Sequence, residues 1–385
     1  MAQVNKRTVI ENVRIFDGHG LTESQNVVID GNVIGDTRQD GDEVIDGQNG
    51  ILLPGLIDSH VHLQNEGHLR QLAKYGVTTA LDMATWPADK INGLRNRVGV
   101  ADVRSAGLPV TAAGSLHSHI LPLPDEAMLP GPEQARDFVQ KRVDEGSDYI
   151  KIICDVPGPD QETLNQVAEA AHEKGKMVVA HASSYVPCQM ALKAKADIMT
   201  HAPLDKPVDA AMIETMKKQN IISVPTLIMM QEVSKRPPLG TILGMLFKPS
   251  LFFTIIKTRQ ANLGSPTYEN ARASVAEMYR NKIPILAGTD CHEAEGSFAD
   301  VKHGISQHQE LKLLVDAGLS TVDAIRAATV LPAKHFGLED RGVIEVGKRA
   351  DLVLLREDPI KDINAIGSIA RVWCNGVEYK GTSEN

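Results

Sequence analysis

The feature that most constrains this 385-residue chain is an alternation of short apolar runs with helical patterns between residues 53 and 340. Apolar runs of this length are typical of strands in a parallel sheet, which helices cover on both faces. Eight such runs favour a closed barrel over an open sheet. The runs lie at residues 52–63, 76–83, 108–114, 148–153, 177–182, 197–202, 222–226 and 283–290.

The two ends of the chain have a different pattern. Residues 4–50 contain β-branched runs joined by Asp-Gly steps, which are hairpin signals, and a similar texture returns at residues 342–381. Two β-rich ends that flank an α/β middle are expected to pair. We therefore predict an α/β fold with a (β/α)8 TIM barrel at residues 53–340. We also predict a small β-sandwich domain formed by residues 1–52 and 341–385.

Composition disfavours several classes of function. Aromatic residues are only 4% of the chain and the formal net charge is −9, so a nucleic-acid partner is not expected. The N-terminus lacks the apolar region of a signal peptide. The four cysteines are scattered, which is typical of reduced thiols in a cytoplasmic protein. They are Cys154, Cys188, Cys291 and Cys374.

One strongly apolar segment lies at residues 239–256. It is short for a bilayer span, and a Lys-Pro step interrupts it. We therefore expect a lid over the site or a subunit contact, and no membrane insertion.

The first candidate motif is the pair His60 and His62, which closes the run at residues 52–63. Residues two apart on a strand point to the same side, so both imidazoles would face the barrel axis. Two imidazoles that converge from one strand end can begin a zinc site. A lone His-x-His pair is a weak signal, because strands carry histidines for many reasons.

Lys151 lies within the apolar run at residues 148–153, where an ammonium group is costly unless it is paired or neutralised. One interpretation is a buried ion pair with Asp155 or Asp290. The other is carboxylation by CO₂, which gives a carbamate whose two oxygens can bridge two cations. Burial favours the neutral amine that this reaction needs. From this residue alone, the ion pair is the simpler interpretation.

Three more residues follow apolar runs: His181, His201 and Asp290. Each alone has an ordinary structural explanation, such as a core histidine bonded to a carbonyl or a helix cap. Together they should meet at the C-terminal ends of the strands, where barrel active sites are assembled. Imidazole and carboxylate ligands suit zinc, with manganese, iron or cobalt as alternatives. We predict a two-metal site with the ligands His60, His62, Lys151, His181, His201 and Asp290.

This pattern resembles the amidohydrolase superfamily, in its binuclear subtype with a carboxylated lysine. The resemblance spans nearly the whole chain and is most similar to the imidazolonepropionase-like and prolidase-like branch, whose members cleave amides of amino acids and related compounds. It rests on an opening strand at residues 54–63, a helix pair at residues 321–338, and closing segments at residues 340–359 and 370–379.

The resemblance implies that His60, His62 and Asp290 hold one ion and that His181 and His201 hold the other. Carboxylated Lys151 would lie between the two ions. The branch also implies a homo-oligomer.

Two departures from the branch put a dipeptide substrate in doubt. Residues 112–120 read AAGSLHSHI where dipeptidases of the branch often carry a Gly-Gly-His-Gly segment. Residues 224–231 lack an aromatic that is commonly expected there.

The implied function is metal-dependent hydrolysis, in which a hydroxide that bridges the two ions attacks an amide C–N bond of a small molecule. Asp290 would take the proton and pass it to the leaving group. His119, with His117 as its rival, would donate to the carbonyl oxygen. An N-acyl amino acid, a dipeptide and a cyclic amide are all candidate substrates.

Other functions remain open on the same metal centre. They are a lactonase or other ester hydrolase, and a dehydratase or decarboxylase of a specialised metabolite. A one-metal deaminase is disfavoured, because residues 177–184 and 197–205 contain no Glu to shuttle protons. A non-catalytic scaffold is disfavoured because no ligand is missing.

Overall fold

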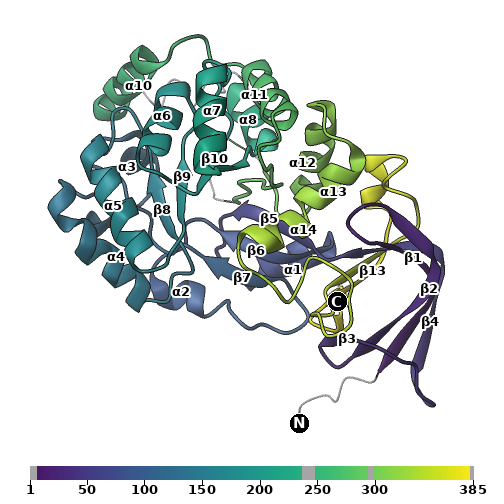
Figure 1. The fold of residues 1–385 in the computed structure, drawn as a ribbon. Coiled ribbons are helices and arrows are strands. Elements are labelled where there is room, and N and C mark those ends of the chain that lie inside the picture. Colours follow the sequence, from purple (N-terminus) through teal and green to yellow (C-terminus); the bar gives the residue numbers. More distant parts are fainter. Residues whose placement is uncertain (1–6, 236–247, 294–298, 300, 382–385) are drawn as a thin grey trace.

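The computed structural model describes residues 7–235, 248–293, 299 and 301–381, and shows an α/β fold (Figure 1). Seven buried parallel strands form two sheets, one of three strands in the order β5-β6-β7 and one of four in the order β11-β10-β9-β8. These strands are β5 (Leu56–Val61), β6 (Val77–Asp82), β7 (Asp102–Ser105), β8 (Ile150–Ile153), β9 (Val178–His181), β10 (Ile198–Thr200) and β11 (Ile222–Val224).

Two of the eight predicted strands are corrected. The third strand is β7 and not residues 108–114, which contribute isolated bridges such as Val110 to Ile152. The eighth segment, residues 283–290, makes a single parallel bridge from Ile285 to Ser223, and a second bridge joins Cys291 to Val61. The described residues therefore form two parallel sheets, and no single eight-stranded sheet is continuous among them.

Helices follow most of the parallel strands, as their amphipathic patterns predict. Asp160 caps α5 by accepting the N–H of Thr163 at 2.7 Å, and Gly175 follows its end with a positive φ of 66°. The helices are α1 (Glu66–Lys74), α2 (Ala88–Asn92), α3 (Leu116–Ile120), α4 (Ala135–Asp144), α5 (Gln161–Glu173), α6 (Tyr185–Lys193), α7 (Ala210–Gln219), α8 (Leu227–Ser234), α10 (Pro249–Ala261), α11 (Tyr268–Arg280), α12 (Ile305–Asp316), α13 (Thr321–Ala327) and α14 (Val330–His335). Short 3₁₀ turns are η1 (Asp125–Ala127), η2 (Pro132–Gln134) and η3 (Ile363–Gly367).

The two ends of the chain pair in one seven-stranded sheet, which lies beside the α/β body (Figure 1, purple and yellow). The two ends meet where β4 pairs antiparallel with β12. The terminal strands thus form a single sheet, and the predicted sandwich is not confirmed. The order is β14 (Val377–Glu378), β13 (Ile369–Cys374), β12 (Leu352–Leu355), β4 (Glu43–Pro54), β1 (Thr8–Phe16), β2 (Leu21–Asp30), β3 (Val33–Gly35).

The apolar segment at residues 239–256 lies partly outside the described residues. Its described end belongs to α10, which packs against α3 and exposes Phe252 and Phe253. No helix in the described part of the chain is both long and apolar enough to cross a membrane.

Candidate metal centre

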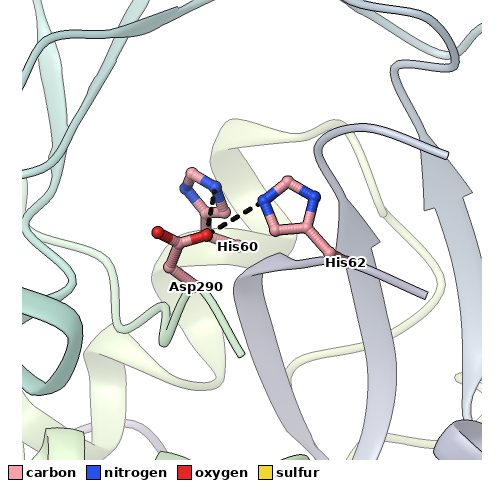
Figure 2. A group of neighbouring side chains, drawn as sticks. All are labelled: His60, His62 and Asp290. Carbon is pink, nitrogen blue, oxygen red and sulfur yellow. Dashed lines mark ion pairs between the residues drawn. The ribbon is translucent and has the colours of Figure 1, made fainter. Parts of the chain in front are cut away.

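His60, His62 and Asp290 converge at the C-terminal end of β5 (Figure 2). One carboxylate oxygen of Asp290, Oδ1, lies 3.3 Å from Nε2 of His60 and 2.9 Å from Nε2 of His62. The three side chains each offer one ligand atom, and these atoms lie within 4.8 Å of one another. The spacing predicted from the His-x-His motif is therefore found in the structure, with Asp290 completing the group.

Local features bring Asp290 to β5. A Cβ at Gly288 would lie 2.9 Å from the backbone nitrogen of His60, so only glycine permits this close approach. The buried carboxylate of Asp58 accepts the N–H of Thr289 at 3.0 Å and its hydroxyl at 2.8 Å. Asp58 also accepts the N–H of His60 at 3.2 Å, and burial raises its pKa to about 7. Asp58 thus ties the segment before Asp290 to the strand that carries the histidines.

The surroundings shift the pKa values of all three side chains, and the shifts of His60 and Asp290 favour the forms that bind metal. Burial holds the pKa of His60 well below its usual value, so its imidazole is neutral. Burial opposes charge on Asp290 as well, but the neighbouring His60 and His62 outweigh it and hold the pKa of Asp290 well below its usual value. For His62, the hydrogen bond and charge of Asp290 outweigh burial and raise its pKa. An ionised carboxylate therefore faces two imidazoles.

Lys151 on β8 is buried, with 4% of its surface exposed. Its Nζ donates to Oγ1 of Thr200 at 3.0 Å. No carboxylate among the described residues lies within ion-pair distance of Nζ, so the ion pair considered from the sequence is not formed. Burial lowers the pKa of Lys151 to about 7. A large share of this amine is therefore neutral near pH 7.

His181 and His201 continue the group from the ends of β9 and β10. Their ring centroids lie 4.3 Å apart, and the ring of His201 lies 5.0 Å from that of His60. Nδ1 of His201 lies 4.0 Å from Oδ2 of Asp290 and 2.8 Å from Oγ1 of Thr226. Burial lowers the pKa of His201 to about 3 and that of His181 well below its usual value. Both imidazoles are neutral.

The backbone is unusual at three of these positions. His201, Thr226 and Asp290 have positive φ angles of 75°, 47° and 57°. Non-glycine residues rarely adopt this left-handed conformation, and such strain clusters at functional sites. His201 directly follows β10, and Thr226 lies two residues after the end of β11.

His117 on α3 belongs to a second cluster of side chains. The sequence analysis considered this histidine only as a rival of His119. Nδ1 of His117 lies 2.6 Å from Oδ2 of Asp155, and its ring centroid lies 4.3 Å from that of His181. These three residues also offer ligand atoms within 4.8 Å of one another. His119 is partly buried on the same short helix.

The sequence prediction missed several supporting residues. It did not assign a role to Asp58, Thr226 or Thr200, each of which contacts a predicted ligand or its strand. Asp58 precedes the His-x-His motif by two residues, which was the only sequence signal for it. The contacts of Thr200 and Thr226 join different strands and have no local pattern.

The chain is similar in sequence to known enzymes. An adenine deaminase from Nitratidesulfovibrio vulgaris (strain DP4) is 25% identical over 357 residues, covering 90% of this chain and 54% of that protein. An imidazolonepropionase from Pyrobaculum arsenaticum is 24% identical over 212 residues, covering 54% of this chain and 43% of that protein. The chain thus spans about half the length of the curated relatives that it matches.

A solved structure supports the fold over nearly the full length. A Xaa-Pro dipeptidase superimposes with a TM-score of 0.79 at 24% identity, covering 98% of this chain and 100% of that chain. The model of the Amidohydrolase family matches residues 51–378, which is most of the chain. These findings confirm the resemblance that the motifs predicted, and the chain belongs to the Amidohydrolase family.

Proposed function

We propose that this chain is a metal-dependent hydrolase that cleaves an amide C–N bond of a small molecule. One observation carries the proposal: Oδ1 of Asp290 lies within 3.3 Å of an Nε2 atom on both His60 and His62. The neutral imidazoles of His181 and His201 stand beside this group. Family membership and the adenine deaminase and imidazolonepropionase relatives support cleavage of C–N bonds.

The finer architecture belongs to the same proposal. We infer that β5–β11 and residues 284–291 form the eight strands of a (β/α)8 barrel at residues 53–340. Its support is the pair of bridges that joins Ile285 to β11 and Cys291 to β5. Residues 1–52 and 341–385 would form the satellite β-domain.

The donor set fits a pair of divalent cations. His60, His62 and Asp290 would hold one ion, and His181 and His201 the other. The neutral imidazoles are in the form that binds metal, and Nδ1 of His60 is buried without a hydrogen-bond partner among the described residues.

Lys151 is the group that fits between the two ions. Its buried amine has a pKa near 7 and no ionic partner in the described chain, which suits carboxylation by CO₂. Zinc is the best match for these ligands, with manganese, iron or cobalt as alternatives. Bound ions would supply Lewis acidity and lower the pKa of water toward neutrality.

Proton transfer and stabilisation of the carbonyl oxygen would fall to side chains of this chain. Asp290 is ionised and can accept the proton of the attacking water and return it to the leaving nitrogen. A histidine of α3 would donate to the carbonyl oxygen as negative charge develops there. The ring contact with His181 and the bond to Asp155 favour His117 over His119 for this role.

We propose a small-molecule amide as the substrate. N-acyl amino acids, dipeptides and cyclic amides are the classes to assay.

A deaminase is the second candidate, because several relatives carry that name. Both reactions break a C–N bond, but a deaminase releases ammonia from an amino-substituted ring. The two are distinguished by assaying ammonia and carboxylic acid release separately.

The test is a screen of protein purified without chelator. It should contain close to two divalent ions per chain. It should hydrolyse members of a panel of cyclic amides, N-acyl amino acids, dipeptides and lactones, with activity that a chelator removes and added zinc restores. A metal-free protein that remains inactive after zinc loading would contradict the proposal. If the protein preferred lactones, the proposed reaction would be ester cleavage and not amide cleavage.

A further inference from the structure

Helix α8 begins without the side-chain cap that its sequence offers. Thr226 occupies the N-cap position, where threonine is preferred, yet its side chain makes no capping hydrogen bond. Its hydroxyl oxygen lies 2.8 Å from Nδ1 of His201 instead. The first backbone N–H groups of α8 therefore need another acceptor.

Glu310 supplies that acceptor from helix α12. Its side chain is fully buried, with no exposed surface. Oε1 accepts the N–H of Leu227 at 2.9 Å, and Oε2 accepts the N–H of Ile228 at 2.7 Å. Burial raises the pKa of Glu310 to about 8, so the capping rests on these two hydrogen bonds. Glu310 thus performs the capping that Thr226 gives up.

The backbone of Thr226 explains why this support is needed. Its φ of 47° and ψ of 49° are left-handed, and a β-branched residue is rarely found there. Such a conformation costs about 1–3 kcal/mol and persists only where the surroundings impose it. The two bonds from Glu310 hold the residues that follow Thr226, and Thr226 is itself fully buried.

We propose that Glu310 is a positioning residue for the metal centre: by capping α8 it releases the hydroxyl of Thr226 to orient the ring of His201. This inference rests on the proposed function, because it takes His201 as a metal ligand. A neutral imidazole whose Nδ1–H donates to Oγ1 of Thr226 presents the lone pair of Nε2 to an ion. Glu310 itself touches no ligand atom.

The test compares variants of the full chain loaded with Co²⁺, whose visible spectrum reports ligand geometry. Glu310→Gln keeps the side-chain shape and turns one acceptor into a donor. Thr226→Val keeps the β-branched shape and removes the hydroxyl. Both should weaken the binding of one of the two ions by about 10–100-fold and change the Co²⁺ spectrum in the same way. Thr226→Ser keeps the hydroxyl and should bind both ions as the wild type does.

Two controls separate positioning from stability. Asp102→Asn changes a buried carboxylate at the opposite ends of the strands, and should lower stability while leaving the Co²⁺ spectrum unchanged. The double variant of Glu310→Gln and Thr226→Val should bind metal no more weakly than either single variant, because both act on one ligand.

Unchanged affinity and spectrum in the folded variants would overturn the inference. Thr226→Val decides the question if Glu310→Gln fails to fold. A wild-type chain that binds no Co²⁺ would overturn the proposed function instead.

Discussion

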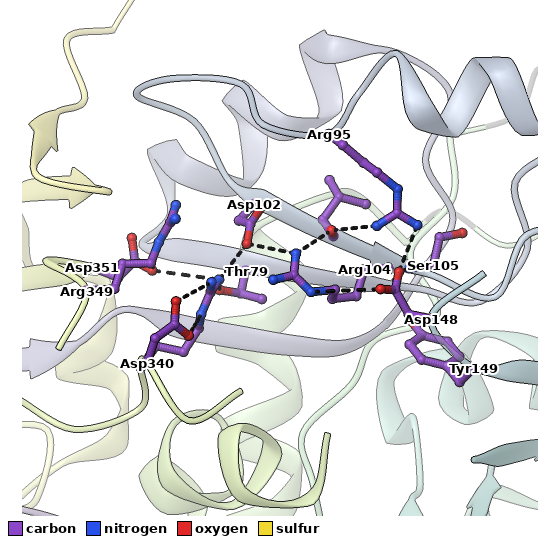
Figure 3. Close-up of polar contacts among 12 residues, drawn as sticks. Thr79, Arg95, Asp102, Arg104, Ser105, Asp148, Tyr149, Asp340, Arg349 and Asp351 are labelled. Carbon is purple, nitrogen blue, oxygen red and sulfur yellow. Dashed lines mark hydrogen bonds and ion pairs between the residues drawn. The ribbon is translucent and has the colours of Figure 1, made fainter. Parts of the chain in front are cut away.

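The pairing of charged side chains differs between the two ends of the parallel strands. At the N-terminal ends, charged groups are paired with one another (Figure 3). Arg341, with 3% of its side chain exposed, donates to Oδ2 of Asp102 at 2.8 Å and also contacts Asp340, while Arg95 pairs with Asp148. Toward the C-terminal ends, Nζ of Lys151 bonds Thr200, the last residue of β10, and has no ionic partner within the described chain. The charged groups at one end are paired, and the buried amine near the other end is not.

The histidines show the same division. Burial lowers the pKa of His201, which directly follows β10, to about 3. Groups whose pKa burial displaces are features of functional sites, whereas paired charges at the N-terminal face of a barrel serve stability. The comparison therefore predicts that substitutions at the two ends affect different properties.

The largest effect on turnover is expected from Asp290→Asn. Loss of the proton acceptor should lower kcat by about 10²–10⁴-fold, while the amide oxygen keeps much of the metal. The measurement is kcat with metal content determined on the same sample. Asp102→Asn, at the opposite ends of the strands, is the matched control and should leave kcat unchanged. Equal losses in both variants would erase the distinction between the two ends.

Lys151→Ala should have the next largest effect. Removal of the bridging group should cost about 3 kcal/mol of transition-state stabilisation, on the order of 10²-fold in rate. Added acetate or propionate should restore part of the activity by filling the space with a carboxylate. The assay is turnover with and without these acids. Full activity in the variant without any added acid would remove Lys151 from the site.

A pH dependence should follow from the same lysine. The pKa of Lys151 is lowered to about 7 by burial, so the neutral amine that reacts with CO₂ increases as pH rises through this value. At constant dissolved CO₂, metal uptake by the apo-protein should therefore rise between about pH 6 and 8. Metal content after dialysis measures this. Lys151→Glu carries a permanent carboxylate, so metal uptake by this variant should not depend on CO₂. Metal uptake by the wild type that is independent of CO₂ would contradict carboxylation.

Arg341→Ala should have the smallest effect on turnover and a clear one on stability. Removing one partner of a buried ion pair costs up to about 3–5 kcal/mol, and the expected loss lies at the lower end because Arg104 still pairs with Asp102 at 3.1 Å. Urea denaturation of the variant should show this loss. The kcat of folded, metal-loaded protein should remain that of the wild type. A lowered kcat in fully folded Arg341→Ala would show that the paired end also shapes the site.

The sequence predicted the parts of the fold that depend on local patterns. Apolar runs located β5, β6 and β8 to β11. The helix pair that the family resemblance implied at residues 321–338 is found as α13 and α14. The third strand was misplaced because β7 reads Asp-Val-Arg-Ser, and its charged residues face ion-pair partners at the N-terminal face. The segment at residues 283–290 looked like a strand but makes only isolated bridges there.

The prediction of the site was limited in the same way, because contacts between residues far apart in sequence have no local pattern. Strand-end positions were enough to predict that His60, His62 and Asp290 meet, because the C-terminal ends of parallel strands share one edge. Strand-end positions could not predict the capping role of Glu310, whose partners lie 82 and 83 residues away in sequence. They could not choose between His117 and His119 either, because the choice depends on how the short helix α3 turns toward Asp155.

The most direct test of this account is an anomalous-scattering map from crystals of the zinc-loaded protein. Two peaks are expected: one among His60, His62 and Asp290, and one beside His181 and His201. Density should extend from Nζ of Lys151 toward both peaks. A map without peaks, in which Lys151 carries a free ammonium group paired with a carboxylate, would contradict it.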